Sequence, residues 1–229
     1  MKLARPDVFH PRVVLAGCPQ RPAGDADDAG LVAALRRRGL HSRWMSWDFR
    51  ETLQADLVIL RAAQDWRVRR EEFLKWTGRV KSLLNPPAVV IWNSAARYLE
   101  DIETAGVPTL FGDTTVETVS LIFVGGQQSH AVTDTRAVEP EFESWDVGHA
   151  ALAVAAGRAG IQGSELLCAR VDVTAREPVR VVDVNVIAPC LGWRLLDKDA
   201  RERAQRSFAI AVQSACRRLG LGPLSQRRP

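Results

Sequence analysis

Short apolar runs of strand length alternate with amphipathic helical segments through the first half of this sequence. In the longest helical segment, Phe73, Trp76 and Val80 recur at the spacing of one helix face. Such alternation is typical of βαβ units that build a parallel sheet. The expected strands are residues 12–16, 42–47, 56–60 and 88–92, and the expected helices lie between Asp28 and Gly39, at 70–84 and at 95–104. We therefore expect residues 1–110 to form an α/β domain with a doubly wound parallel sheet.

A ligand cleft is expected where these strands end, because doubly wound sheets bind ligands beyond the carboxyl ends of their strands. The residues at that edge offer a thiol, a guanidinium, an indole and an amide, which belong to Cys18, Arg61, Trp66 and Asn93. Two of them have a simpler interpretation. A Trp at a strand end is often part of the core, and a Cys is reactive only where its pKa is lowered.

The second half of the sequence pairs its strands in hairpins. Residues 119–124 and 129–133 flank a turn at Gly125 and Gly126, and residues 166–173 and 179–186 flank a turn at 176–178. A small-residue helix at 147–160 and a final helix from Asp199 to Leu219 accompany them. This grouping predicts an α+β unit with antiparallel strands over residues 111–222, followed by a tail at 223–229.

Two carboxylates and an amide are expected to meet on one face of the second hairpin. Residues two apart in a strand face the same side, so Asp183 and Asn185 point together. Asp172 lies opposite them if the hairpin closes around residues 176–178. Such hard oxygen ligands suit Mg²⁺. Alternatively, the two aspartates pair with arginines such as Arg170, and Asn185 bonds to a neighbouring loop.

Several segments, in the same order, resemble the glutathione-synthetase-like ATP-grasp proteins of bacteria. The stretch ARVDV at 169–173 and the stretch RVVDVNVIAPCLG at 180–192 resemble the two strands that carry metal ligands in that superfamily. Similar stretches lie at 55–76, 83–109 and 120–132, so the resemblance covers about residues 13–219. It implies a pre-ATP-grasp-like domain at 1–110 and an ATP-grasp remnant at 111–222. It also implies that Asp172, Asp183 and Asn185 hold Mg²⁺. Arg170, next to them in the sequence, is our candidate cofactor-binding residue.

The departures from that pattern concern the parts that hold ATP. Where the family has a phosphate-binding lysine after its Trp-Asn motif, this chain has Ala96. From Thr109 the sequence runs almost directly to Glu117, so the ATP lid subdomain is missing from it, and an arginine-bearing loop is shortened after Val132. Phosphoryl transfer depends on positive charge at the phosphates, so these departures make ATP binding doubtful. No catalytic residue is assigned.

Charge and cysteine content narrow the classes of partner and location. The formal net charge is +4, but the arginines are interspersed with acidic residues and accompany no nucleic-acid-binding motif, so nucleic acid is not favoured. The four cysteines form no CxxC pair, which speaks against zinc. We see no signal peptide and no membrane-spanning run, and we expect a cytoplasmic protein with reduced thiols.

Three functions remain open. The leading hypothesis is a degenerate ATP-grasp protein without ligase activity that acts as a binding or assembly module, with a homodimer or a partner protein on the vacated lid face. The second is a minimal ATP- and Mg²⁺-dependent carboxylate–amine ligase whose nucleotide site uses Arg97, Arg136 or Arg170. The third is a small-molecule or peptide binder that uses the N-terminal cleft.

Overall fold

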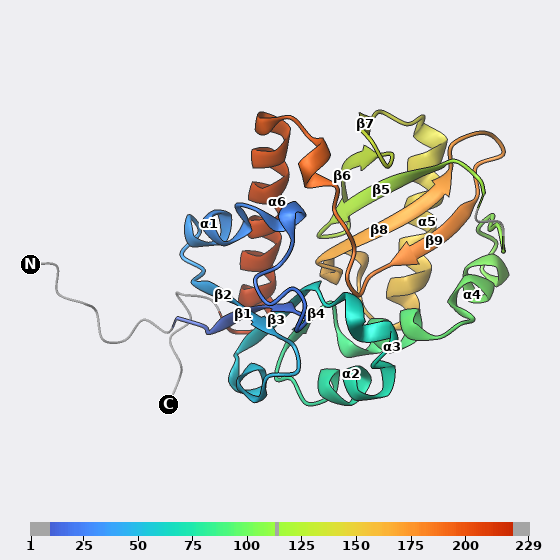
Figure 1. Cartoon of the computed structure of the whole chain (residues 1–229). Coiled ribbons are helices and arrows are strands. Elements are labelled where there is room, and N and C mark those ends of the chain that lie inside the picture. Colours follow the sequence, from blue (N-terminus) through green and yellow to red (C-terminus); the bar gives the residue numbers. More distant parts are fainter. Residues whose placement is uncertain (1–9, 113–114, 222–229) are drawn as a thin grey trace, which may run out of the picture.

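A computed structural model describes residues 10–112 and 115–221 of the chain (Figure 1). Its first half contains β1 Val13–Gly17, α1 Leu31–Arg36, β2 Ser42–Ser46, β3 Leu57–Ala62, α2 Arg70–Thr77, β4 Leu83–Leu84, α3 Pro87–Ser94 and α4 Tyr98–Thr104. Its second half contains β5 Thr118–Val124, β6 Gln127–Val132, β7 Ala137–Val138, α5 Phe142–Arg158, β8 Cys168–Thr174, β9 Val181–Asn185 and α6 Lys198–Arg218. Short 3-10 turns connect several of these elements, among them one at Ala26–Asp28.

The first sheet is parallel throughout and has the strand order β2-β1-β3-β4. All residues of β1 and β3 are buried, because helices and loops cover both faces of these two central strands. In the sequence, strands buried on both faces appear as continuous apolar runs and not as an alternation of apolar and polar residues. The doubly wound parallel sheet expected from the sequence is thus confirmed.

Two expectations in this half are wrong. Residues 88–92 belong to helix α3, in which Pro87 occupies the first turn, where a missing N–H is harmless. Ile91 is 52% exposed although Val89 and Val90 are buried, so this short apolar run has one buried helix face. The fourth strand is instead β4, which we expected to be the end of a longer helix; α2 already ends at Thr77, before Gly78.

The second sheet is antiparallel and has the order β7-β6-β5-β8-β9 (Figure 1). Both expected hairpins are confirmed, as β5–β6 and β8–β9. Helix α5 covers one face of this sheet and packs closely at Gly148, where a Cβ would lie 2.7 Å from a methyl carbon of Leu121. The opposite face of β8 and β9 carries the polar residues singled out in the sequence.

The two sheets share part of their core. Helix α6 returns from the second half and packs beside α1, over the first sheet (Figure 1). One apolar cluster therefore contains Leu15 and Ile59 of the first sheet, Ile122 of the second, and Phe208 of α6. The division at residue 110 stays a prediction, and the core continues across it. The predicted tail at 223–229 lies outside the described residues. Among the described helices, none is both long enough and apolar enough to cross a membrane.

Candidate functional site

The expected polar cluster forms on the hairpin of β8 and β9. The strands pair so that Asp172 lies opposite Asp183, and Arg170 lies opposite Asn185. The alternate residues of β8, such as Val171, pack against α5 on the other side of the sheet. The structure therefore brings all four residues together on one sheet face, as the spacing predicts. We call these four residues the hairpin cluster.

An ion pair within the hairpin cluster engages Asp172. The Arg170 Nε donates to one carboxylate oxygen of Asp172 at 2.7 Å, and its Nη2 donates to the other at 2.9 Å. The side chain of Asp172 is 12% exposed, whereas that of Arg170 is 28% exposed. Two parallel charge-assisted bonds of this kind are strong and fix the geometry of both groups. This is the arginine pairing that the sequence left as an alternative to a metal.

Asp183 and Asn185 are also engaged within the protein. The hydroxyl of Tyr98, from α4, donates a short hydrogen bond to Asp183. Burial raises the pKa of the Asp183 carboxyl, and the nearby Asp172 carboxylate adds to that rise. The side-chain oxygen of Asn185 accepts from the backbone N–H groups of Ile187 and Ala188, both at 3.1 Å. Sequence reasoning missed Tyr98, which is 85 residues from its partner.

In this arrangement, the three side chains predicted to hold Mg²⁺ all have partners within the protein. A Mg²⁺ site needs carboxylate oxygens that are free to face the ion in near-octahedral geometry. Here Asp172 uses both oxygens on Arg170, Asp183 faces a phenol, and Asn185 caps a turn. In the described part of the chain, no group of three or more His, Cys, Asp or Glu side chains could hold a metal ion.

The four residues of the expected ligand cleft are buried beneath the second half of the chain. Cys18 and Trp66 belong to an apolar cluster that also includes Ile187 and Ala188, which follow β9. Asn93 donates to the carbonyl of Val184 at 2.7 Å and accepts from the N–H of Val186 at 3.1 Å. The carboxyl edge of the parallel sheet thus binds the segment after β9 rather than presenting these side chains to solvent.

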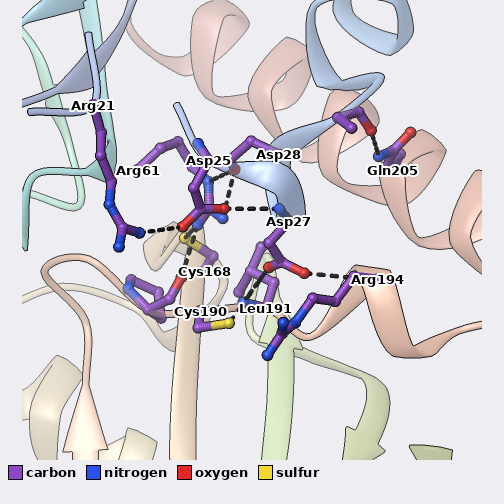
Figure 2. A network of polar contacts seen from close by, with 12 residues as sticks. Arg21, Asp25, Asp27, Asp28, Arg61, Cys168, Cys190, Leu191, Arg194 and Gln205 are labelled. Atoms are coloured by element: carbon purple, nitrogen blue, oxygen red, sulfur yellow. Dashed lines mark hydrogen bonds and ion pairs between the residues drawn. The ribbon is translucent and has the colours of Figure 1, made fainter. Parts of the chain in front are cut away.

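Arg61, the fourth of these residues, forms a buried ion pair with Asp28 (Figure 2). The Arg61 Nη2 lies 2.8 Å from Asp28 Oδ1, and the two side chains are 2% and 3% exposed. Arg61 also donates to the Pro189 carbonyl at 3.1 Å and lies over the ring of Trp193. Burial lowers the pKa of Arg61, but the Asp28 carboxylate outweighs this effect, and the net shift is upward. Arg61 therefore stays charged and ties β3 to the segment after β9.

Asp27 extends the same network (Figure 2). One of its carboxylate oxygens accepts from the N–H of Leu191 at 2.9 Å, and the other accepts from the N–H of Arg194 at 3.0 Å. In the sequence, Asp27 and Asp28 stand at the start of an expected helix. Two adjacent aspartates in the loop after the first strand, together with an arginine at the end of another strand, are the sequence signal that could have predicted this network.

His130 is also held in place. Its Nε2 lies 2.7 Å from the carbonyl oxygen of Leu191, so Nε2 carries the proton and donates. Its Nδ1 then accepts from the Ser129 hydroxyl at 2.9 Å. Burial lowers the pKa of His130, which favours the neutral imidazole. The ring links β6 to the segment after β9 and has no proton-transfer partner among these contacts.

Besides Arg170, the exposed Arg67 lies close enough to the hairpin cluster for its charge to lower the pKa of Asp183, against the larger effect of burial. Ala96, at the expected lysine position, is exposed. Lys75 and Lys81 lie in the first half and have Glu71 and Asp56 as their ion-pair partners. Residues 105–117 alone connect α4 to β5, at the place where the family resemblance implies a lid subdomain.

Comparison with known proteins identifies the fold. Residues 13–85 match the family model of the N-terminal domain of D-cycloserine synthetase DcsG. The crystal structure of that synthetase is similar with a TM-score of 0.76 at 18% identity, and the match covers 91% of this chain and 99% of that one. The ATP-grasp ligase PsnB, complexed with the precursor peptide PsnA2 and AMPPNP, gives a TM-score of 0.56 at 13% identity, covering 88% and 98% of the two chains. The chain has an ATP-grasp-related fold.

Within this ATP-grasp-related fold, the sequence similarity is partial. The cycloserine biosynthesis protein DcsG of Streptomyces lavendulae is 30% identical over 122 residues, which make up 51% of this chain. The matched region spans only 38% of that relative's length. The structural neighbours share less than a fifth of their residues with this chain, so they establish its fold.

Proposed function

We propose that this protein is a degenerate member of the ATP-grasp superfamily that has lost ATP-dependent ligase activity and acts as a binding or assembly module. The observation that carries the proposal is the state of the hairpin cluster. Each side chain that the resemblance assigns to Mg²⁺ already has protein partners: Arg170 for Asp172, Tyr98 for Asp183, and two backbone N–H groups for Asn185.

The ion pairs of two candidate phosphate-binding arginines support the same proposal and leave Arg67 as the cation near Asp183. Bringing the phosphates of ATP onto the sheet face requires cations that offset their charge and a cover that excludes water. Arg170 is already paired with Asp172, and Arg97 is paired with Glu100 on the surface. A nucleotide would have to break the first of these pairs before it could use Arg170.

Calorimetric titration with ATP and Mg²⁺ tests the proposal. We expect no measurable heat of binding at nucleotide concentrations up to about 1 mM, which corresponds to a binding free energy weaker than about −4 kcal/mol. The ATP-grasp ligase PsnB, titrated under the same conditions, is the positive control. Micromolar binding of MgATP to this chain would refute the degenerate assignment.

The alternative is a minimal ATP- and Mg²⁺-dependent carboxylate–amine ligase. The match of residues 13–85 to the DcsG N-terminal domain favours it, since that relative is a D-cycloserine synthetase. Arg97, Arg136 or Arg170 would complete the nucleotide site. Its test is ADP release in the presence of MgATP and mixed amino acids, compared between the natural chain and Asp183→Asn. ADP release that the substitution abolishes would establish this alternative.

A binding role also has support from a relative and from the surface. PsnB is known in complex with a precursor peptide. Phe111, in the connection that replaces the lid, is 44% exposed, and Phe142 at the start of α5 is 75% exposed. These two exposed aromatic side chains are our candidate contacts for a homodimer or a protein partner. If the purified protein sediments as a monomer at micromolar concentration, the homodimer is excluded.

A further inference from the structure

A groove of about 640 Å³ lies away from the hairpin cluster, between helix α6 and the β5–β6 hairpin. One wall is α6, and the other includes Gln127, Gln128 and His130 of β6. A volume of this size is within the range of sites that enclose a ligand or several side chains of a bound chain. None of the interactions of the hairpin cluster reaches this groove.

The α6 wall is a single stripe of the helix. Arg203, Ser207, Ile210, Ser214 and Arg218 recur at intervals of three or four residues and all line the groove. Such spacing places side chains on one face of a helix. A different stripe of α6, which includes Phe208 and Val212, is buried in the core. The groove stripe therefore makes no contribution to the core and is available to a ligand, with Ile210 41% exposed at its centre.

The charge of the groove has one sign. An arginine lies at each end of the stripe, and no Asp or Glu is among the lining residues. Arg203 and Arg218 have no ion-pair partner in the described part of the chain, whereas Arg69 and Arg158 elsewhere are paired. Two unpaired guanidinium groups that flank a small, partly apolar centre complement a ligand with carboxylates at its ends.

The hairpin wall offers unpaired backbone. Strand β7 pairs only with Ala131 and Val132 of β6, so Gln127 and Gln128 have no strand partner on their outer side among the described residues. Free strand edges can pair with an extended peptide. A bulge at Ser129 interrupts the ladder to β5, so regular main-chain pairing would be limited to the two glutamines.

We propose that this groove binds an extended acidic peptide segment of a partner protein. Arg203 and Arg218 are fifteen positions apart, which places them about 22 Å apart along the helix axis. An extended chain of about seven residues spans that length. Carboxylates near its two ends pair with the arginines, small side chains cover Ile210, and the backbone meets Gln127 and Gln128. This proposal rests on the proposed binding-module role and names its partner class.

Fluorescence anisotropy with a defined probe tests the proposal. The probe is a labelled peptide Asp-Val-Thr-Val-Thr-Val-Glu, and the comparison peptide has Lys at both ends. We expect the acidic probe to bind at least about tenfold more tightly than the basic one, and its affinity to fall as NaCl is raised. The double variant Arg203→Glu with Arg218→Glu should lose the acidic probe and gain the basic one.

Matched variants keep the test specific to the groove. Arg206→Glu with Arg217→Glu changes the net charge by the same amount on α6 but alters residues that do not line this groove. This control should retain the acidic probe. The proposal would be overturned if the two peptides bound equally or if neither bound. It would also be overturned if both double variants lost the acidic probe equally, or if a single-stranded oligonucleotide displaced the probe with no peptide preference. The MgATP titration is independent of these results, so the two proposals fail separately.

Discussion

Arg170 and Asp172, two residues apart on β8, are joined by two parallel hydrogen bonds of 2.7 and 2.9 Å. This pair joins a residue that the ATP-grasp resemblance assigns to Mg²⁺ with our candidate cofactor-binding residue. The two residues meet because alternate residues of a strand share a face. The strand periodicity from which the cluster is predicted therefore also brings Arg170 and Asp172 close enough to form an ion pair.

Substitution of Arg170 tests the pairing directly. Arg170→Met should destabilise the protein by about 2 kcal/mol, because it leaves the largely buried Asp172 without its counter-charge next to Asp183. It should also create measurable affinity for Mn²⁺, since the two carboxylates then need a cation. Urea unfolding and Mn²⁺ electron paramagnetic resonance measure these two effects. A variant as stable as the natural protein, with no gain in Mn²⁺ binding, would contradict the pairing.

The Arg61–Asp28 pair should be a major support of the contact between the two halves. Arg61→Met alone should cost about 3–5 kcal/mol, because it leaves the Asp28 carboxylate buried and unpaired. Adding Asp28→Asn should recover a large part of that loss. Denaturant unfolding of both single variants and the double variant gives the coupling free energy. Additive effects of the two substitutions would show that the pair does not act as a unit.

Asn85 should be equally sensitive to substitution. Its amide nitrogen donates to the carbonyls of Cys168 and Val186, and its oxygen accepts from the N–H of Leu167, all between 2.7 and 2.8 Å. Asn85→Ala should destabilise by about 3 kcal/mol, because it leaves several buried backbone groups unpaired. Thermal unfolding measures the loss. Gln20→Ala, which removes an exposed amide side chain, is the control and should change stability little.

His130 predicts a pH dependence. Its pKa in the folded protein is lowered by burial, so the folded state binds fewer protons than the unfolded state below the ordinary histidine pKa of about 6.5. The stability that the neutral His130 side chain contributes is therefore fully present above that pH. It is lost as the pH falls toward the pKa of His130 in the folded protein. His130→Gln should reduce this slope, as measured by urea unfolding between about pH 7.5 and pH 5.5. His149→Gln controls for the loss of a histidine, and an unchanged slope in His130→Gln would contradict the assignment.

The sequence predicts the local parts of this structure well. The pairing of Asp172 with Asp183 follows from strand periodicity and a turn, because all the information lies within one hairpin. The short run at 88–92 is different, since apolar residues alone do not distinguish a buried strand from a helix with one exposed position. Tyr98 and the Arg61–Asp28 pair depend on contacts between distant segments, which no local pattern encodes. For the same reason, the sequence does not show that the segment after β9 covers the residues of the expected ligand cleft.

The most direct test of the account is a crystal structure of the protein grown with ATP and Mg²⁺. We predict that the Arg170–Asp172 pair and the Tyr98–Asp183 bond are intact, with no metal or nucleotide density beside the hairpin cluster. A Mg²⁺ ion coordinated by Asp172, Asp183 and Asn185 with the phosphates of a bound nucleotide would contradict it.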